Sequence, residues 1–288
     1  MKNHLVQRLI FGLLYAAVIV FATHPAGSLL LKSIGLDISQ YYLYYLLIIS
    51  LSLLSIKECI SIMKFGNGWA KYLVFIMAGA VLYRYSVKYF NHGFSFRINL
   101  SEILGLSLVL IAIITLFKFR TELYTENGKL IFTVIYASLT YGFALGIPSF
   151  SYSQAFSLEA FFLFVLIWSS DTFAFVFGRL FGKHKIAPKI SPKKTWEGFL
   201  GSFFSTLLLS YFINKNFPEL KGNWIIVGIL VTIFGPLGDL VESQLKRNFG
   251  VKDSGSLIPG HGGVLDRLDS FIICSPVIYL YFMLDRLS

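Results

Sequence analysis

Long stretches of apolar residues without any charged side chain recur along the whole chain. A helix that crosses the hydrocarbon core of a membrane needs about 20 predominantly apolar residues. Most of the stretches lack the single polar face of a soluble amphipathic helix. Two further stretches carry one internal charge each, Arg84 in 72–88 and Asp171 in 159–178. The pattern therefore predicts nine membrane-spanning helices: 9–31, 38–56, 72–88, 103–117, 130–158, 159–178, 199–214, 222–238 and 270–284.

The composition excludes a soluble fold of this length. Of the 288 residues, 56% are hydrophobic and 14% are charged, whereas soluble domains carry about 25% charged residues. The mean hydropathy is +0.69. The same numbers exclude disordered and collagen-like chains, and Cys59 and Cys274 have no disulfide or zinc spacing. The fold class predicted is an all-α, polytopic integral membrane protein.

The positive charge predicts how the chain is oriented. Lys and Arg number 25 against 15 Asp and Glu, a net charge of +10. With the N-terminus inside, 18 of the 25 basic residues fall on the inner side and seven on the outer side. This bias favours a cytoplasmic N-terminus in a multi-pass protein of the inner (cytoplasmic) membrane. The first stretch is too long for a signal-peptide core, so we expect it to be retained. The surplus is expected to serve orientation and phosphate binding, with no nucleic-acid partner.

Polar residues are distributed unevenly between two regions. Residues 1–158 are hydrophobic helices with short connections, and we expect them to serve packing or an interface. From 159 to 288, polar residues cluster at the predicted inner ends of helices. The second region is therefore the predicted catalytic membrane domain.

The first polar cluster spans 171–198. Six basic residues and no acidic one lie between Arg179 and Lys194, and Ser191 or Thr195 could cap the following helix. A helix N-terminus flanked by lysines is a natural phosphate site. The alternative is a plain positive-inside loop touching lipid headgroups. Asp171 either faces a polar cavity or pairs with a basic residue near the interface. The candidate substrate-binding residues here are Ser191, Lys193, Lys194 and Thr195.

The second polar cluster spans 238–269. Asp239, Glu242, Ser243 and Lys246 are spaced to share one helix face, and so are Asp266 and Asp269. Carboxylates on facing helices suit Mg²⁺, which binds through one or two carboxylates plus substrate phosphates.

A glycine-rich segment, 252–263, lies between the two helices of this cluster and ends in His261, Gly262 and Gly263. Glycines let the backbone approach a phosphate closely. The alternatives are a simple turn and an interfacial ion-pair cluster. The coincidence of acidic, basic and glycine residues at one membrane face favours a site.

At these residues the sequence resembles the phosphatidate cytidylyltransferases, also called CDP-diacylglycerol synthases. Their signature runs Ser-x-x-Lys-Arg, four residues, Lys-Asp, a loop of small residues, Pro-x-His-Gly-Gly and Asp-Arg-x-Asp. The segment 171–198 resembles a second block of the family, with Phe175 where tyrosine is expected. The first signature is matched by Ser243, Lys246, Arg247, Lys252, Asp253, Pro259, His261, Gly262, Gly263, Asp266, Arg267 and Asp269.

The resemblance implies that CTP and phosphatidic acid react to give CDP-diacylglycerol and pyrophosphate. It implies Mg²⁺, as one or two ions, held by Asp239 and Asp266 with Asp269 second. The site would face the cytoplasm, where CTP is found, and a homodimer is left open. The implied catalytic residues are Asp239, Lys246, His261, Asp266 and Arg267, and the implied substrate-binding residues beside those of the first cluster are Ser243, Arg247, Lys252, Gly262 and Gly263.

Two other functions stay open at this point. Charged residues inside or at the ends of membrane helices also occur in ion-coupled transporters. A related nucleotidyltransferase could act on another lipid phosphate, such as a polyprenyl phosphate.

Overall fold

The computed structural model describes residues 2–66, 68–91, 94, 99–150, 156–188, 190–257 and 262–285. These residues are almost entirely helical, as the sequence predicts. The helices of the first half are α1 (Lys2–Thr23), α2 (Ala26–Ser33), α3 (Gln40–Ile62), α4 (Ala70–Phe90), α5 (Leu100–Lys118), α6 (Arg120–Leu123), α7 (Glu126–Val134), the π-helix η1 (Ile135–Leu139), α8 (Thr140–Gly146) and the 3₁₀-helix η2 (Ile147–Phe150). The second half contains α9 (Glu159–Phe181), β1 (Lys185–Ala187), β2 (Ser191–Thr195), α10 (Trp196–Asn216), α11 (Trp224–Asn248) and α12 (Leu265–Asp285).

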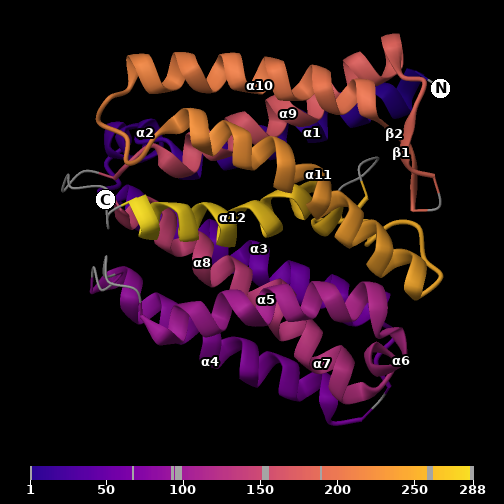
Figure 1. Ribbon diagram of the computed structural model, residues 1–288. Coiled ribbons are helices and arrows are strands. Elements are labelled where there is room, and N and C mark those ends of the chain that lie inside the picture. Colours follow the sequence, from indigo (N-terminus) through magenta and orange to yellow (C-terminus); the bar gives the residue numbers. More distant parts are fainter. Residues whose placement is uncertain are drawn as a thin grey trace.

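The long helices lie roughly along one direction and form layers, with α10 at one side and α4 at the other (Figure 1). The N-terminus, the β1–β2 hairpin and α6 lie at one end of the molecule, which we call the hairpin end. The C-terminus and α2 lie at the opposite end. Hydrogen bonds join segments at the hairpin end: the Tyr124 hydroxyl donates to the Asn248 carbonyl at 2.8 Å, and the Asn248 amide donates to the Leu116 carbonyl at 3.0 Å. Several basic segments that the sequence places on one side of the membrane thus lie together.

Seven described helices are long and apolar enough to cross a membrane, and the count rises to eight if one bent pair is a single span. The bent pair is Ile10–Thr23 with Ala26–Ser33, at 89° to each other. The sequence predicts one straight span there. Pro25 lies at the break, and proline cannot continue the hydrogen-bond ladder of a helix. The count of nine is not confirmed, because α10 is not among the candidates.

The predicted span 130–158 is divided differently in the structure. The candidate span is Glu126–Gly146, made of α7, η1 and α8, and 89% of its apolar window is buried. The next helix, α9, begins only at Glu159. This segment therefore forms a central helix of the bundle rather than a lipid-facing one.

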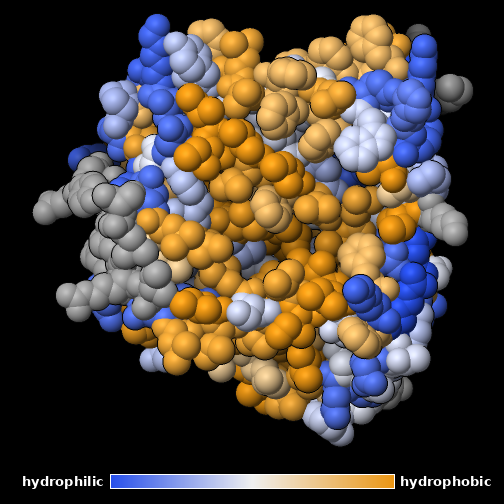
Figure 2. Space-filling view, in the orientation of Figure 1, coloured by the Kyte–Doolittle hydropathy of each residue, from blue (hydrophilic) through white to orange (hydrophobic). Residues whose placement is uncertain are grey.

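The surface carries an apolar band with polar residues gathered towards both ends (Figure 2). Large apolar side chains are exposed on the long helices, for example Leu13 of α1, Ile76 of α4 and Leu208 of α10. In water such an exposed area would be costly, whereas lipid tails solvate it. The protein is therefore a multi-pass membrane protein.

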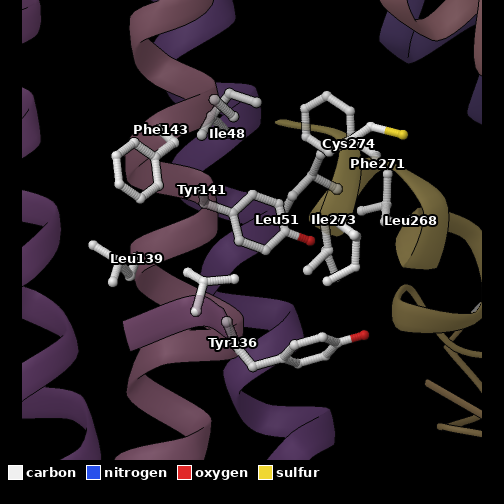
Figure 3. Packing of buried hydrophobic residues seen from close by; sticks show 14 of the residues in the cluster. Ile48, Leu51, Tyr136, Leu139, Tyr141, Phe143, Leu268, Phe271, Ile273 and Cys274 are labelled. Carbon is white, nitrogen blue, oxygen red and sulfur yellow. The ribbon is translucent and has the colours of Figure 1, made fainter. Parts of the chain in front are cut away.

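The core joins both halves of the chain. Tyr141 of α8 points toward Phe271 and Ile273 of α12 (Figure 3). Phe143 lies on another side of α8, where its ring contacts those of Tyr85 of α4 and Tyr279 of α12. The Ser55 and Tyr141 hydroxyls are hydrogen-bonded at 2.8 Å within this core. Helix α12, which carries predicted site residues, is thus packed between the first half and the second. The homodimer is not tested by this single chain.

Candidate active site

A cavity of about 620 Å³ lies between α1, α9, the hairpin, α10, α11 and α12. Its volume falls in the range of pockets that bind small molecules and cofactors. Ten polar residues from both predicted clusters are in its wall: Asp171, Thr172, Ser191, Lys193, Lys194, Thr195, Asp239, Asp266, Arg267 and Asp269. The two clusters, separated by some forty residues of sequence, therefore meet at one site.

Four carboxylates from three helices line the cavity. Asp171 comes from α9, Asp239 from α11, and Asp266 and Asp269 from the first turns of α12. Asp171, for which the sequence left open a polar cavity or a basic partner, lines this cavity. Carboxylates and cationic side chains share this cavity, and Asp171 interacts electrostatically with Lys194 and Arg267.

Lys194 joins the hairpin to α11. Its ammonium group lies 2.8 Å from Asp239 Oδ2 and donates to the Pro236 carbonyl at 2.7 Å. The other oxygen of Asp239 accepts a hydrogen bond of 3.1 Å from the Ser243 hydroxyl, one helical turn away. Asp239 is therefore held from both sides, by a lysine of the first cluster and a serine of its own helix.

The basic loop of the first cluster is a short antiparallel hairpin, which the sequence did not predict. Thr195 caps α10, as one of the two predicted candidates, by accepting a 3.2 Å hydrogen bond from the Gly198 amide. Glu197 accepts hydrogen bonds from the Lys183 and His184 amides and lies 2.6 Å from His184 Nδ1. The hydrogen bond to His184, together with those backbone donors, lowers the pKa of Glu197 to about 2. A carboxylate at the start of α10 thus anchors the hairpin beside the cavity.

Lys246 lies behind the cavity wall rather than in it. Its ammonium group pairs with Glu242 at 2.8 Å and with Asp266 Oδ1 at 2.5 Å, and all three side chains are largely buried. The second oxygen of Asp266 accepts from the Ser254 amide at 3.0 Å and from the Gly263 amide at 2.9 Å. In the structure Lys246 contacts carboxylates. Its binding of a substrate phosphate stays a prediction.

Gly262 and Gly263 lie against the Asp266 side of this network. Gly262 has a positive φ of 85°, and a Cβ there would lie 2.5 Å from Asp266 Oδ2. A Cβ at Gly263 would collide with the Ser254 hydroxyl. Both positions therefore require glycine for the loop to close on Asp266. Their predicted contact with phosphate stays a prediction.

Of the remaining predicted residues, those that the structure describes are not in the cavity wall. Arg247 is exposed and donates to the Val251 carbonyl at 3.2 Å, and Lys252 is exposed in the following loop. Ser243 contacts Asp239 but is not in the cavity wall. His261 lies outside the described residues.

The carboxylates of the cavity are the groups to consider for Mg²⁺. Within the described ranges, no group of three or more His, Cys, Asp or Glu side chains is placed to hold a metal ion. Asp239 and Asp269 nevertheless line one cavity with Asp171, and Asp269 Oδ1 accepts a 2.7 Å hydrogen bond from the Ser270 amide. Such a donor set fits a magnesium ion that takes most of its ligands from water and substrate phosphates.

Two polar residues of the first half were not expected at the site: Tyr15 lies in the cavity wall, and Glu58 lies behind it. Tyr15 of α1 lines the cavity and donates to the Arg267 carbonyl at 3.2 Å. Glu58 of α3 accepts hydrogen bonds from the start of α12. The only sequence signal is that Glu58 stands near the end of an apolar stretch, after Lys57, and its partners lie about two hundred residues away.

Fold and site together define a polytopic helical membrane protein in which acidic and basic side chains converge on a cavity suited to phosphate compounds. The family model described as the cytidylyltransferase family matches residues 7–285. The chain belongs to the cytidylyltransferase family.

Curated relatives agree with the family. A phosphatidate cytidylyltransferase of Staphylococcus aureus is 38% identical over 187 residues, which are 63% of this chain and 68% of that protein. One from Staphylococcus haemolyticus is 40% identical over 188 residues, with the same coverage of both chains. One from Staphylococcus epidermidis is 51% identical over 120 residues, 41% of this chain and 46% of that protein. The resemblance that the motifs indicated is thus confirmed.

Proposed function

We propose that this protein is an enzyme that transfers a cytidylyl group from CTP to phosphatidic acid and releases pyrophosphate. The observation that carries the proposal is the cavity, whose wall contains two lysines of the hairpin together with carboxylates of α9, α11 and α12. The family and the curated relatives support the same reaction. The product is CDP-diacylglycerol, a precursor in phospholipid biosynthesis.

The reaction brings two polyanions together. A phosphate oxygen of phosphatidic acid attacks the α-phosphorus of CTP, and the bond from that phosphorus to the bridging oxygen of the β-phosphate breaks. The electron pair leaves with pyrophosphate. No covalent enzyme intermediate is needed, so the protein contributes positioning and charge neutralisation. Lys193, Lys194 and Arg267 are the cationic side chains of the cavity and would contact the phosphates.

The sequence placed Asp239 and Asp266 first as Mg²⁺ ligands and Asp269 second. Because both oxygens of Asp266 are bonded to Lys246 and to the amides of Ser254 and Gly263, we assign the ion to Asp239 and Asp269, with Asp266 supporting them. When bound, Mg²⁺ neutralises charge on the phosphates and on the leaving pyrophosphate. The ion pair between Lys194 and Asp239 sets the distance between the hairpin and α11 before substrates enter.

A pyrophosphate-release assay in mixed micelles tests the reaction. With the purified protein, CTP and phosphatidic acid, pyrophosphate is expected, and it should fall to background if either is omitted. ATP, GTP and UTP replace CTP in one series, and phosphatidylglycerol or a polyprenyl phosphate replaces phosphatidic acid in another. Release with a polyprenyl phosphate alone would refute phosphatidic acid as the substrate. The transporter alternative is not favoured by the family or by its relatives.

The proposed location is the inner membrane, with the hairpin end and the cavity open to the cytoplasm. Both native cysteines are buried, so single exposed cysteines can report the side. Lys185→Cys lies on the hairpin and Ser33→Cys lies at the end of α2, at the opposite end of the molecule. A membrane-impermeant thiol reagent added to intact cells should label Ser33→Cys alone, and should label Lys185→Cys only after lysis. The reverse pattern would invert the proposed orientation.

A further inference from the structure

Glu58 is a buried carboxylate of α3 that contacts the start of α12. Its side chain belongs to the first half of the chain, and the residue is 8% exposed. Oε1 accepts a 2.8 Å hydrogen bond from the Val264 amide, and Oε2 accepts one of 2.9 Å from the Leu265 amide. Glu58 is not in the cavity wall.

These two hydrogen bonds cap α12. The first amides of a helix have no partners within the helix, and they need acceptors when they are buried. A negative charge at this end also interacts favourably with the helix dipole. Caps are usually side chains from the residue just before the helix. In α12 the acceptor instead comes from another helix, 206 and 207 residues away in sequence.

Ser254 connects Glu58 to the active-site network. The hydroxyl of Ser254 lies 2.9 Å from Glu58 Oε2 and 2.9 Å from Asp266 Oδ2, and its single proton can be donated to one of them at a time. Its backbone amide donates to Asp266 as well. Glu58, Ser254 and Asp266 therefore form one chain of contacts, which continues to Lys246.

The glycines around Glu58 show how closely the loop is packed on its carboxylate. A Cβ at Gly255 would lie 2.9 Å from Glu58 Oε1, and a Cβ at Gly263 would lie 2.5 Å from the same atom. Real Cβ atoms do not approach so closely, so the loop fits around this carboxylate only with glycine at these positions.

We propose that Glu58 is a positioning residue for the cytidylyl transfer. By capping α12 and holding Ser254, it fixes the first turn of α12, on which Asp266, Arg267 and Asp269 reach the cavity. The first half of the chain thereby contributes to catalysis through α3. This inference rests on the proposed function, because the turn that Glu58 holds is the one assigned to substrate and metal.

The test compares Glu58→Gln with a matched control. Gln keeps the size of the side chain, but its amide offers one oxygen and places an NH₂ group against amide donors, so at least one donor loses its acceptor. A displaced first turn should lower kcat about 10- to 100-fold, the range seen when groups that orient a site are removed. KM for CTP and for phosphatidic acid should change less than kcat, because Glu58 does not line the cavity.

The control is Glu102→Gln, which also removes a fully buried carboxylate. Glu102 of α5 pairs with Lys88 at 2.5 Å, at the opposite end of the molecule. We expect it to lower thermal stability in detergent while kcat of the folded protein stays within about twofold. If kcat fell in both variants in proportion to their loss of thermal stability, Glu58 would be a structural residue only. That result would overturn the proposal.

Hydrogen exchange measured by mass spectrometry provides a readout that does not need activity. Glu58→Gln should speed exchange in peptides covering 262–269 and leave peptides of α5 unchanged. Unchanged exchange and unchanged kcat would overturn the proposal. If the wild-type protein showed no cytidylyl transfer but the variant still exchanged faster, the proposed function would be refuted. The role of Glu58 in holding the start of α12 would then still stand. If Glu58→Gln does not purify as folded protein, Ser254→Ala carries the same two measurements.

Discussion

Replacing Lys246 by Met should destabilise the protein strongly. Lys246 is the cation between Glu242 and Asp266, and the three side chains are 9%, 1% and 11% exposed. Asp266 keeps the donors Ser254 and Gly263 after the change. Glu242 keeps none among the described residues, because its Oε2 is bonded to Lys246 and its Oε1 has no partner there. Removing one partner of a buried ion pair costs about 3–5 kcal/mol, mostly because the other charge stays buried and unpaired.

The expected loss is therefore about 3–5 kcal/mol in the free energy of unfolding. Adding Glu242→Met should restore most of it, because replacing both members of a buried ion pair by apolar residues of similar volume is often near neutral. The assay is equilibrium unfolding in mixed micelles with a denaturing detergent. Lys129→Met is the matched control: Lys129 is also largely buried, but its partner Glu126 is 42% exposed, so water can solvate the carboxylate that is left and the loss should be smaller than for Lys246→Met. A Lys246→Met variant as stable as this control, or a double variant no better than the single one, would refute the reasoning.

Three further predictions concern the site. Asp239→Asn should lower kcat for pyrophosphate release at least about 100-fold, because it removes a charge from the cavity. The control Asp253→Asn, at an exposed residue of the neighbouring loop, should leave kcat unchanged. If both variants had the same kcat, Asp239 would not belong to the site. Chelation by EDTA should abolish pyrophosphate release and added Mg²⁺ should restore it, so full activity in EDTA would contradict the magnesium proposal. Glu197→Gln should destabilise the protein at neutral pH, because the folded pKa of Glu197 lies near 2, below its ordinary 4.5. The stabilisation is complete above 4.5 and is lost as the pH falls towards 2, so the difference between variant and wild type should shrink over that window. A difference that stays constant in denaturant titrations from pH 7 to pH 3 would contradict this assignment.

The helices of the bundle could be predicted from sequence because lipid leaves few choices. An apolar stretch of sufficient length must satisfy its backbone internally, so it forms a helix. The ends and breaks were less predictable. Pro25 bends the first predicted span, and α10, the predicted span 199–214, is not among the candidate membrane spans. Length and the absence of charge do not reveal such differences.

The site could be predicted in part, because its local geometry follows from spacing. Asp239 and Ser243, at i and i+4, are joined by a hydrogen bond, and Thr195, one of the two residues that the sequence offered as a cap, caps α10. Long-range contacts could not be predicted. Spacing does not tell whether Lys246 meets a substrate phosphate or a carboxylate of another helix. Nor does it connect Glu58 with residues two hundred positions away.

The most direct test of the central claim follows the phosphorus atoms of CTP. The purified protein is incubated with phosphatidic acid and CTP labelled in either the α- or the γ-phosphorus, and the lipid and aqueous products are separated. Attack on the α-phosphorus predicts that the α label appears in CDP-diacylglycerol and the γ label in soluble pyrophosphate. The account would be contradicted if the γ label appeared in the lipid, or if neither form of labelled CTP gave a labelled lipid.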